Sequence, residues 1–244
     1  MASEAPIKVL VCGNGRMGAL VRASVEADDA FELVGQVGIE DVDALDAGEV
    51  PVADLVIDFT NHAMLPHLAA YLKGNPAALV SGTTGFEAED FAVLDELSER
   101  MPVMWSANYS LGVAVLRRLA AEAAKALEGF DIEIVETHHN QKVDAPSGTA
   151  KLLLSAVDPD GACNVVSGRD GMVGARTKRE VGMHALRGGT VAGTHEVHFF
   201  GTDEEVCLTH RATSRQIFVN GAVAAAKRLA AQKPGRYSFE ELML

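Results

Sequence analysis

The chain has 244 residues, a formal net charge of −13 and a pI near 5.0. This acidic balance, without a run of Lys or Arg, argues against nucleic acid and anionic membrane surfaces as partners. No apolar run is long enough to cross a membrane, so we expect a cytoplasmic protein. Cys12, Cys163 and Cys207 are widely spaced and form no C-x-x-C pair, which predicts reduced thiols.

A glycine-rich turn follows the first expected strand. Residues 7–12 are apolar and lead into a G-x-G-x-x-G motif, after which a helical pattern extends to residue 27. Between a strand and a helix, such glycines allow a tight turn, close approach of a pyrophosphate, and close packing of helix on strand. The motif therefore predicts binding of NADH and/or NADPH by Gly13, Asn14, Gly15, Arg16, Met17 and Gly18.

Strands and helices alternate over the first 110 residues. Further strands are expected at residues 31–37, 53–60, 77–81 and 102–106. Helical patterns cover residues 64–73 and 87–100 between them. This alternation is typical of a Rossmann-type, doubly wound parallel sheet, which binds its ligand beyond the carboxyl ends of the strands.

The end of the second strand bears on the choice of cofactor. A dinucleotide fold carries an acid there for the adenosine ribose hydroxyls, and Glu40 is the first acid, closely followed by Asp41. No Lys or Arg lies between Arg22 and Lys73, so this segment offers no partner for a 2′-phosphate. Arg16 is the nearest basic residue. We therefore predict useful activity with NADH as well as NADPH.

The segment of residues 136–150 combines proton donors with an anion site. It follows an alternating strand pattern at residues 131–135 and precedes a helical pattern at 151–157. His138, His139 and Lys142 lie within five residues of one another. The start of a helix, with unpaired N–H groups and small side chains, attracts anions. The combination predicts a small acidic substrate that receives a proton.

The string E-T-H-H-N-Q-K-V-D-A-P-S-G-T-A in this segment resembles the signature of the 4-hydroxy-tetrahydrodipicolinate reductase family, which acts in lysine synthesis through diaminopimelate. The resemblance implies NAD(P)H-dependent reduction of 4-hydroxy-tetrahydrodipicolinate to tetrahydrodipicolinate, without a metal. It implies that His138 and Lys142 are the proton-donating pair. It also implies that the substrate carboxylates are held by His139, Lys142, Ser147, Gly148 and Thr149.

Shorter segments extend the resemblance along the chain. I-D-F-T at residues 57–60, G-T-T-G at 82–85 and A-N-Y-S at 107–110 are similar to family segments beside the cofactor. They imply cofactor contacts from Phe59, Gly82, Thr83, Thr84, Ala107, Asn108 and Tyr109. Two positions depart from the family pattern: Glu40 stands later than the usual Glu, and Thr194 replaces a Glu.

The second half of the chain predicts a smaller α+β unit with a mixed or antiparallel sheet. We expect residues 1–109 and 216–244 to bind the dinucleotide, and residues 110–215 to bind substrate and form a homotetramer. The pattern predicts antiparallel hairpins among strands at 182–187, 193–200 and 205–212, with apolar groups on both faces of the second. The charged segment 164–180 is interpreted as a solvated loop.

Two other functions are compatible with parts of this pattern. One is another Rossmann-type dehydrogenase, of the aspartate or homoserine type, and the segment 136–150 argues against it. The other is a non-enzymatic dinucleotide sensor, which would not need both His138 and Lys142 beside an anion site. A zinc hydrolase is disfavoured because the adjacent His138 and His139 lack the spacing of metal ligands on one helix face.

Overall fold

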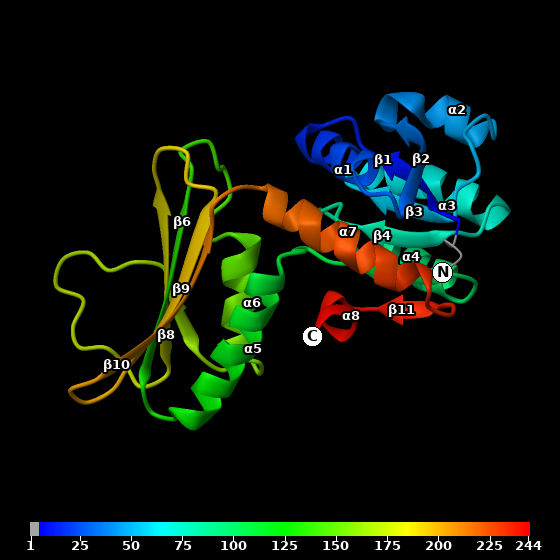
Figure 1. The fold of residues 1–244 in the computed structure, drawn as a ribbon. Coiled ribbons are helices and arrows are strands. Elements are labelled where there is room, and N and C mark those ends of the chain that lie inside the picture. The colour runs from blue at the N-terminus through cyan, green and yellow to red at the C-terminus, as the bar shows by residue number, and fades with distance from the viewer. Residues whose placement is uncertain (1–4) are drawn as a thin grey trace. The chain divides into compact units, whose positions relative to one another are not determined.

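A computed structural model describes residues 5–244. The chain divides into two compact units. One consists of the described residues up to Tyr109 together with Gln216–Leu244, and the other of Ser110–Arg215. Each unit has its own sheet (Figure 1). None of the helices in this described range is long and apolar enough to cross a lipid bilayer.

The first unit contains a six-stranded sheet in the order β2-β1-β3-β4-β5-β11, with all neighbouring strands parallel. The strands are β1 (Ile7–Cys12), β2 (Phe31–Val37), β3 (Leu55–Asp58), β4 (Ala78–Ser81), β5 (Pro102–Trp105) and β11 (Gly235–Tyr237). The predicted doubly wound sheet is therefore confirmed. Its order reverses between β1 and β3, where such sheets bind their ligands.

Helices cover both faces of this sheet. α1 and α7 pack together on one face, and α2, α3 and α4 follow one another over the other. The helices are α1 (Arg16–Glu26), α2 (Val42–Asp46), α3 (Leu65–Gly74), α4 (Ala88–Ser98), α7 (Gln216–Ala230) and α8 (Phe239–Met243), with 3₁₀ turns at Ile39–Asp41 and His62–Met64. Consecutive residues such as Val9, Leu10 and Val11 are fully buried, which explains the continuous apolar runs in the sequence.

The second unit is a five-stranded mixed sheet with two helices on one face (Figure 1). Its strand order is β10-β9-β6-β8-β7. The strands are β6 (Asp131–His138), β7 (Asn164–Val166), β8 (Glu180–Arg187), β9 (Gly193–Phe200) and β10 (Glu205–Ala212), and the helices are α5 (Leu111–Ala126) and α6 (Gly148–Val157). The apolar residues of β6, β8 and β9 pack against these helices around Ile134, Met183 and Phe199.

One predicted hairpin is wrong and one is present. β9 and β10 pair antiparallel as expected, but β8 and β9 do not pair, because β6 lies between them and runs parallel to β8. The glycine-rich connection after β8 passes the end of β6, where Gly188 N donates to His138 O at 2.9 Å. A Gly-Gly segment marks a change of direction in the chain, and it does not determine which strand lies alongside.

The charged segment 164–180 is not simply solvated. Its first residues form β7, which pairs with β8. Arg176 Nε donates to Glu133 at 3.2 Å and Arg169 Nη2 donates to the same carboxylate at 2.9 Å. His184 Nε2 lies 2.6 Å from that carboxylate. The prediction failed because Glu133 is more than thirty residues away in sequence, and local composition gives no sign of such a partner.

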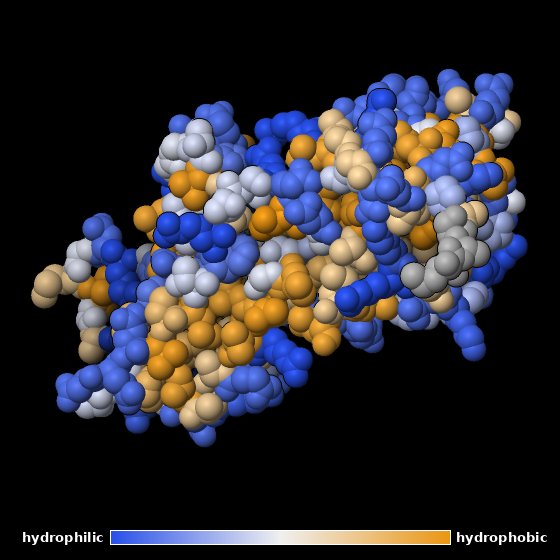
Figure 2. Space-filling view, viewed as in Figure 1, coloured by the Kyte–Doolittle hydropathy of each residue, from blue (hydrophilic) through white to orange (hydrophobic). Residues whose placement is uncertain are grey.

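Exposed apolar side chains lie on both faces of the second unit. Figure 2 shows apolar groups gathered over α5 and α6, and Leu111, Val115 and Leu119 of α5 are all exposed at a spacing of one helical turn. On the sheet face away from the helices, Leu186 and Phe200 are also exposed. The expectation of apolar groups on both faces of β9 is met, since Phe199 is buried while Phe200 is exposed.

Candidate functional site

The glycine motif forms a tight turn between β1 and α1. A Cβ at Gly13, whose φ is +129°, would lie 2.6 Å from Phe59 O, and one at Gly18 would lie 1.9 Å from Gly13 O. Both positions therefore require glycine. Gly15 has no atom within 4 Å of where its Cβ would stand, so a ligand can approach the backbone there. This turn fits a dinucleotide pyrophosphate.

Arg16 and Met17 begin α1 directly after this turn. Arg16 is exposed, whereas Met17 is half-buried.

The two acids that follow β2, Glu40 and Asp41, lie beside the glycine turn. Asp41 accepts a hydrogen bond from Gly38 N at 2.7 Å, which folds residues 39–41 into a 3₁₀ turn. As a result the exposed Glu40 carboxylate accepts a hydrogen bond from the Asn14 side chain. Asp41 is occupied in holding the turn, so Glu40 is the exposed acid beside the glycine turn.

Asp58 joins the ends of β3 and β4. Its buried carboxylate accepts hydrogen bonds from Thr60 N at 3.1 Å, Ser81 Oγ at 2.8 Å and Thr83 Oγ1 at 2.8 Å. Burial raises the pKa of the Asp58 carboxyl, and these donors partly oppose that rise. Asp58 is therefore turned away from solvent and fixes the two loops that carry Phe59 and Gly82.

The remaining predicted cofactor residues differ in exposure. The Phe59 ring covers Gly82, where a Cβ would lie 2.2 Å from Cε1 of the ring. Thr83 is buried, whereas Thr84 and Ala107 are exposed and Asn108 is half-buried. The fully buried Tyr109 donates its hydroxyl to Ser81 O at 2.7 Å. Its side chain thus supports β4.

The proton-donor segment begins inside a strand. β6 continues to His138 rather than ending at residue 135, so Glu136 and His138 point to the same face of the sheet. His138 Nδ1 lies 2.5 Å from Glu136 Oε2. Since a carboxylate only accepts, Nδ1 carries the proton in this pair. The other nitrogen, Nε2, is left as the atom that can exchange a proton with a ligand.

Glu136 is the centre of this site. Its side chain is completely buried, and it accepts two hydrogen bonds from Arg187, each of 2.8 Å, and one from Ser147 N at 3.1 Å. Burial by itself would raise the pKa of the Glu136 carboxyl, but the bonds from Arg187 and His138 outweigh burial and hold that pKa below its usual value. The carboxylate is therefore ionised and holds β6, β8 and the start of α6 together.

His195 lies beside His138, with ring centroids 5.1 Å apart and an edge-to-face arrangement. Its Nε2 lies 3.0 Å from Ser147 Oγ, and Ser147 also caps α6 by accepting a hydrogen bond from Ala150 N. Burial, and then the adjacent His138, lower the pKa of His195 to about 4. His195 is therefore neutral near pH 7 and supports the helix start and the His138 ring.

The other predicted substrate residues surround this core. Lys142 Nζ lies 2.8 Å from Asp144 Oδ1, and that hydrogen bond holds the pKa of the Asp144 carboxyl below its usual value. His139 Nε2 lies 3.2 Å from an Arg215 nitrogen. Gly148 begins α6 and is exposed, followed by the half-buried Thr149. The start of α6 is therefore accessible to an anion.

Glu136, Arg187 and His195 belong to this network of contacts, although none of them is among the site residues that the sequence predicts. For Glu136 a signal existed: it continues the alternation of Ile132 and Ile134, which places an acid on the buried face of a strand. For Arg187 and His195, only the strand pairing reveals the contact. His195 pairs with Glu136 across β9 and β6, and Arg187 pairs with His138 across β8 and β6.

Both units match models of one protein family. The model described as dihydrodipicolinate reductase, N-terminus, matches residues 7–109, and the model described as dihydrodipicolinate reductase, C-terminus, matches residues 112–243. A 4-hydroxy-tetrahydrodipicolinate reductase of Brachyspira hyodysenteriae is 39% identical over 239 residues, covering 97% of this chain and 100% of that protein. One from Caldanaerobacter subterraneus is 42% identical, covering 97% and 98%.

Solved structures share the fold. A dipicolinate-bound dihydrodipicolinate reductase from Paenisporosarcina sp. TG-14 is similar with a TM-score of 0.76 and 22% identity, covering 97% of this chain and 99% of that chain. An amine dehydrogenase from Mycobacterium smegmatis is similar with a TM-score of 0.60 and 12% identity, covering 99% and 96%. At these identities the likeness concerns the arrangement of the chain alone.

We predict that Glu136→Gln lowers the free energy of unfolding by about 3 kcal/mol at pH 7, because it leaves Arg187 without its buried counter-charge. The pKa of Glu136 is lowered by folding. Its contribution is therefore complete above the unfolded pKa of about 4.3 and is lost as pH falls through the lower folded value. Urea unfolding of both proteins should show a difference that shrinks in acid.

The matched control is Glu122→Gln, which removes an exposed partner of Lys125 and should leave stability unchanged. Equal stability of wild type and Glu136→Gln at pH 7 would contradict the central role given to this carboxylate.

Proposed function

The chain belongs to the dihydrodipicolinate reductase family, and we propose that it reduces 4-hydroxy-tetrahydrodipicolinate to tetrahydrodipicolinate in lysine synthesis through diaminopimelate. It is an oxidoreductase: bound NAD(P)H would supply the hydride, and the 4-hydroxyl group of the substrate leaves as water. The observation that carries the proposal is His138, held by the buried Glu136 beside the exposed start of α6. The proton donor and the anion site of the expected reaction thus adjoin each other.

His138 delivers the proton from Nε2. Nδ1–H of His138 donates to Glu136, so Nε2 is the nitrogen from which a proton is offered to the substrate. After the transfer, Nδ1–H still binds Glu136 and the ring keeps its orientation. Lys142 provides a positive charge in the same segment. When the anionic substrate binds, Lys142 leaves its ion pair with Asp144 and pairs with the substrate instead.

The substrate carboxylates are held by His139, Lys142 and the backbone at the start of α6. Ser147 N already donates to Glu136 and its hydroxyl contacts His195. Gly148 and Thr149 therefore supply the backbone donors, while Ser147 anchors the helix. A small dicarboxylate fits this arrangement, and the dipicolinate bound to the Paenisporosarcina reductase has that chemistry.

We predict that His138→Gln and Lys142→Met each reduce kcat by about 100- to 10,000-fold while the protein stays folded, because each removes a proton-donating or charge-stabilising group. The assay is oxidation of NADH with freshly generated product of the upstream synthase. His67→Gln is the matched control, since His67 pairs with Asp46 in the other unit. Near-normal turnover in both site variants would overturn the assignment of these residues.

The cofactor proposal rests on charge at the end of β2. Glu40 accepts a hydrogen bond from Asn14 of the glycine turn, and Asp41 lies beside Glu40 in the 3₁₀ turn after β2. A 2′-phosphate there would meet two acids, whereas ribose hydroxyls can donate to Glu40. The exposed Arg16 is the basic group that starts α1. We propose that the enzyme uses NADH well and accepts NADPH.

We expect kcat/KM for NADH and for NADPH to differ by less than about a hundredfold, roughly 2.7 kcal/mol. Steady-state constants with both cofactors, measured at one substrate concentration series, test this. A stronger preference for NADPH would show that Arg16 or another group neutralises the acids at the end of β2.

The proposed assembly is a homotetramer formed through the sheet of the second unit. Leu186 and Phe200 expose apolar surface on the face that carries no helix. Association of chains buries such exposed apolar surface away from water, which stabilises the assembly. We predict a four-chain mass by light scattering, and smaller species for the Leu186→Glu/Phe200→Glu variant. Val52→Glu, at an exposed position of the other unit, is the control. A stable wild-type monomer at micromolar concentration would contradict this assembly.

A further inference from the structure

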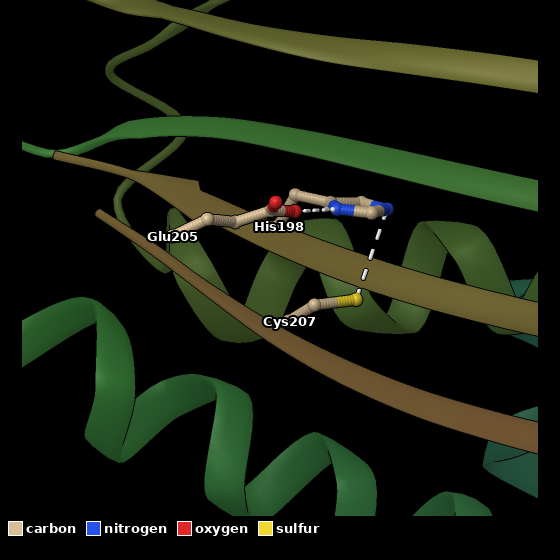
Figure 3. A group of neighbouring side chains, drawn as sticks. All are labelled: His198, Glu205 and Cys207. Carbon is tan, nitrogen blue, oxygen red and sulfur yellow. Dashed lines mark hydrogen bonds and ion pairs between the residues drawn. The ribbon is translucent and has the colours of Figure 1, made fainter. Parts of the chain in front are cut away.

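Strand β9 carries a histidine on each of its faces. His198 lies on the face without helices, where its Nδ1 is 2.6 Å from Glu205 Oε1 (Figure 3). His195 lies on the helix face together with Val197 and Phe199, which are fully buried. His195 itself is only 4% exposed. An imidazole therefore occupies a position at which the alternation of the strand favours an apolar side chain.

Stability does not explain why an imidazole is buried at this position. Its Nδ1 is enclosed in protein and makes no hydrogen bond within the described part of the chain. A buried polar atom without a hydrogen-bond partner destabilises the folded state, so an apolar side chain of similar size would fold at least as well. Burial, and then the adjacent His138, lower the pKa of His195 to about 4, so His195 is not a second proton donor near pH 7. Its contacts with other site residues are what remains to explain it.

The first contact of His195 is with the proton donor. The rings of His195 and His138 meet edge to face, with centroids 5.1 Å apart. Gly193, two residues earlier in β9, has no side chain, and a Cβ at that position would lie 3.1 Å from His138 Nε2. β9 therefore leaves Nε2 of His138 uncovered beside Gly193, and His195 is the side chain of this strand against which the His138 ring packs.

The second contact of His195 is with the start of α6. Ser147 Oγ accepts a hydrogen bond from Ala150 N at 3.1 Å and lies 3.0 Å from His195 Nε2. A neutral imidazole with its proton on Nδ1 accepts the hydroxyl hydrogen at Nε2. This contact holds the residue that caps α6, directly before the backbone of Gly148 and Thr149.

We propose that His195 positions the proton donor and the carboxylate-binding backbone relative to each other, through its ring and its Nε2 respectively. The inference rests on the proposed reduction, because it concerns the residues that perform it. The ring of His195 keeps the imidazole of His138 in one orientation, so loss of this ring lowers kcat. Nε2 holds Ser147 and the first turn of α6, so loss of this nitrogen raises the KM for the substrate.

Two variants separate these contacts. His195→Gln keeps an acceptor for Ser147 but removes the ring, and it should lower kcat by about 10- to 100-fold with little change in the substrate KM. His195→Phe keeps a ring against His138 but removes the acceptor, and it should raise the substrate KM by about 3- to 10-fold with little change in kcat. A merely structural role for His195 would change both constants in the same way in both variants.

The Nδ1–H proton of His138 gives a second readout that needs no reaction, because the buried Glu136 accepts it. Its signal in the proton NMR spectrum is identified by its loss in His138→Gln. We expect this proton to exchange with water about tenfold faster in His195→Gln than in the wild type, because the ring is less restrained. His195→Phe should keep the exchange rate of the wild type.

His210→Gln is the matched control. His210 pairs with His195 in the ladder of β9 and β10, and its Nε2 lies 3.4 Å from Oγ of Ser110, which caps α5. This variant should leave kcat, KM and the His138 signal unchanged.

An inactive wild type would refute the proposed reduction, and the exchange rate of the His138 proton would then still decide the inference. Wild-type constants and wild-type exchange in both His195 variants would overturn the inference while leaving the proposed reduction intact. Equal losses in His210→Gln would also overturn it, since they would show a general effect of histidines in this ladder.

Discussion

The second unit depends on the hydrogen bonds and the ion pair made by the buried, ionised carboxylate of Glu136. A buried charge is tolerated only when hydrogen bonds and an opposite charge compensate for lost water. Here Arg187 supplies the charge, and His138 and the backbone of Ser147 supply further donors. Each donor comes from a different segment. The hydrogen bonds to this one carboxylate therefore align Arg187 of β8, the imidazole of His138 and the first turn of α6.

The central place of β6 in its sheet makes this possible. A strand with neighbours on both sides, β9 and β8, brings His195 and Arg187 to the same face as Glu136. Its opposite face carries Glu133, which binds Arg169 and Arg176. Because side chains alternate strictly along a strand, one segment carries both the pair of Glu136 and His138 on one face and the ion pairs of Glu133 on the other. A shift of register by one residue would exchange the two faces.

The sequence predicted those features that depend on neighbouring residues. The apolar strands, the glycine turn and the capped start of α6 follow from local chemistry, and the family signature predicts a role for His138. The place of β6 between β8 and β9 could not be read in this way, since pairing depends on which strands bury a common core. The same holds for Asp58, whose partners Ser81 and Thr83 lie beyond an intervening helix.

The Asp58 network has a consequence for how such an enzyme can change. Since one carboxylate ties the loops after β3 and β4 together, a substitution in either loop disturbs both. The sequence at the end of the sheet that carries Phe59 and Gly82 is therefore constrained against change. The turn at Glu40 is held by two side-chain contacts, from the exposed Glu40 to Asn14 and from the half-buried Asp41 to Gly38 N. On the proposal that Glu40 receives the adenosine ribose, descendants of this chain can acquire a new coenzyme preference through substitution of this exposed acid, without rebuilding the loops that Asp58 ties together.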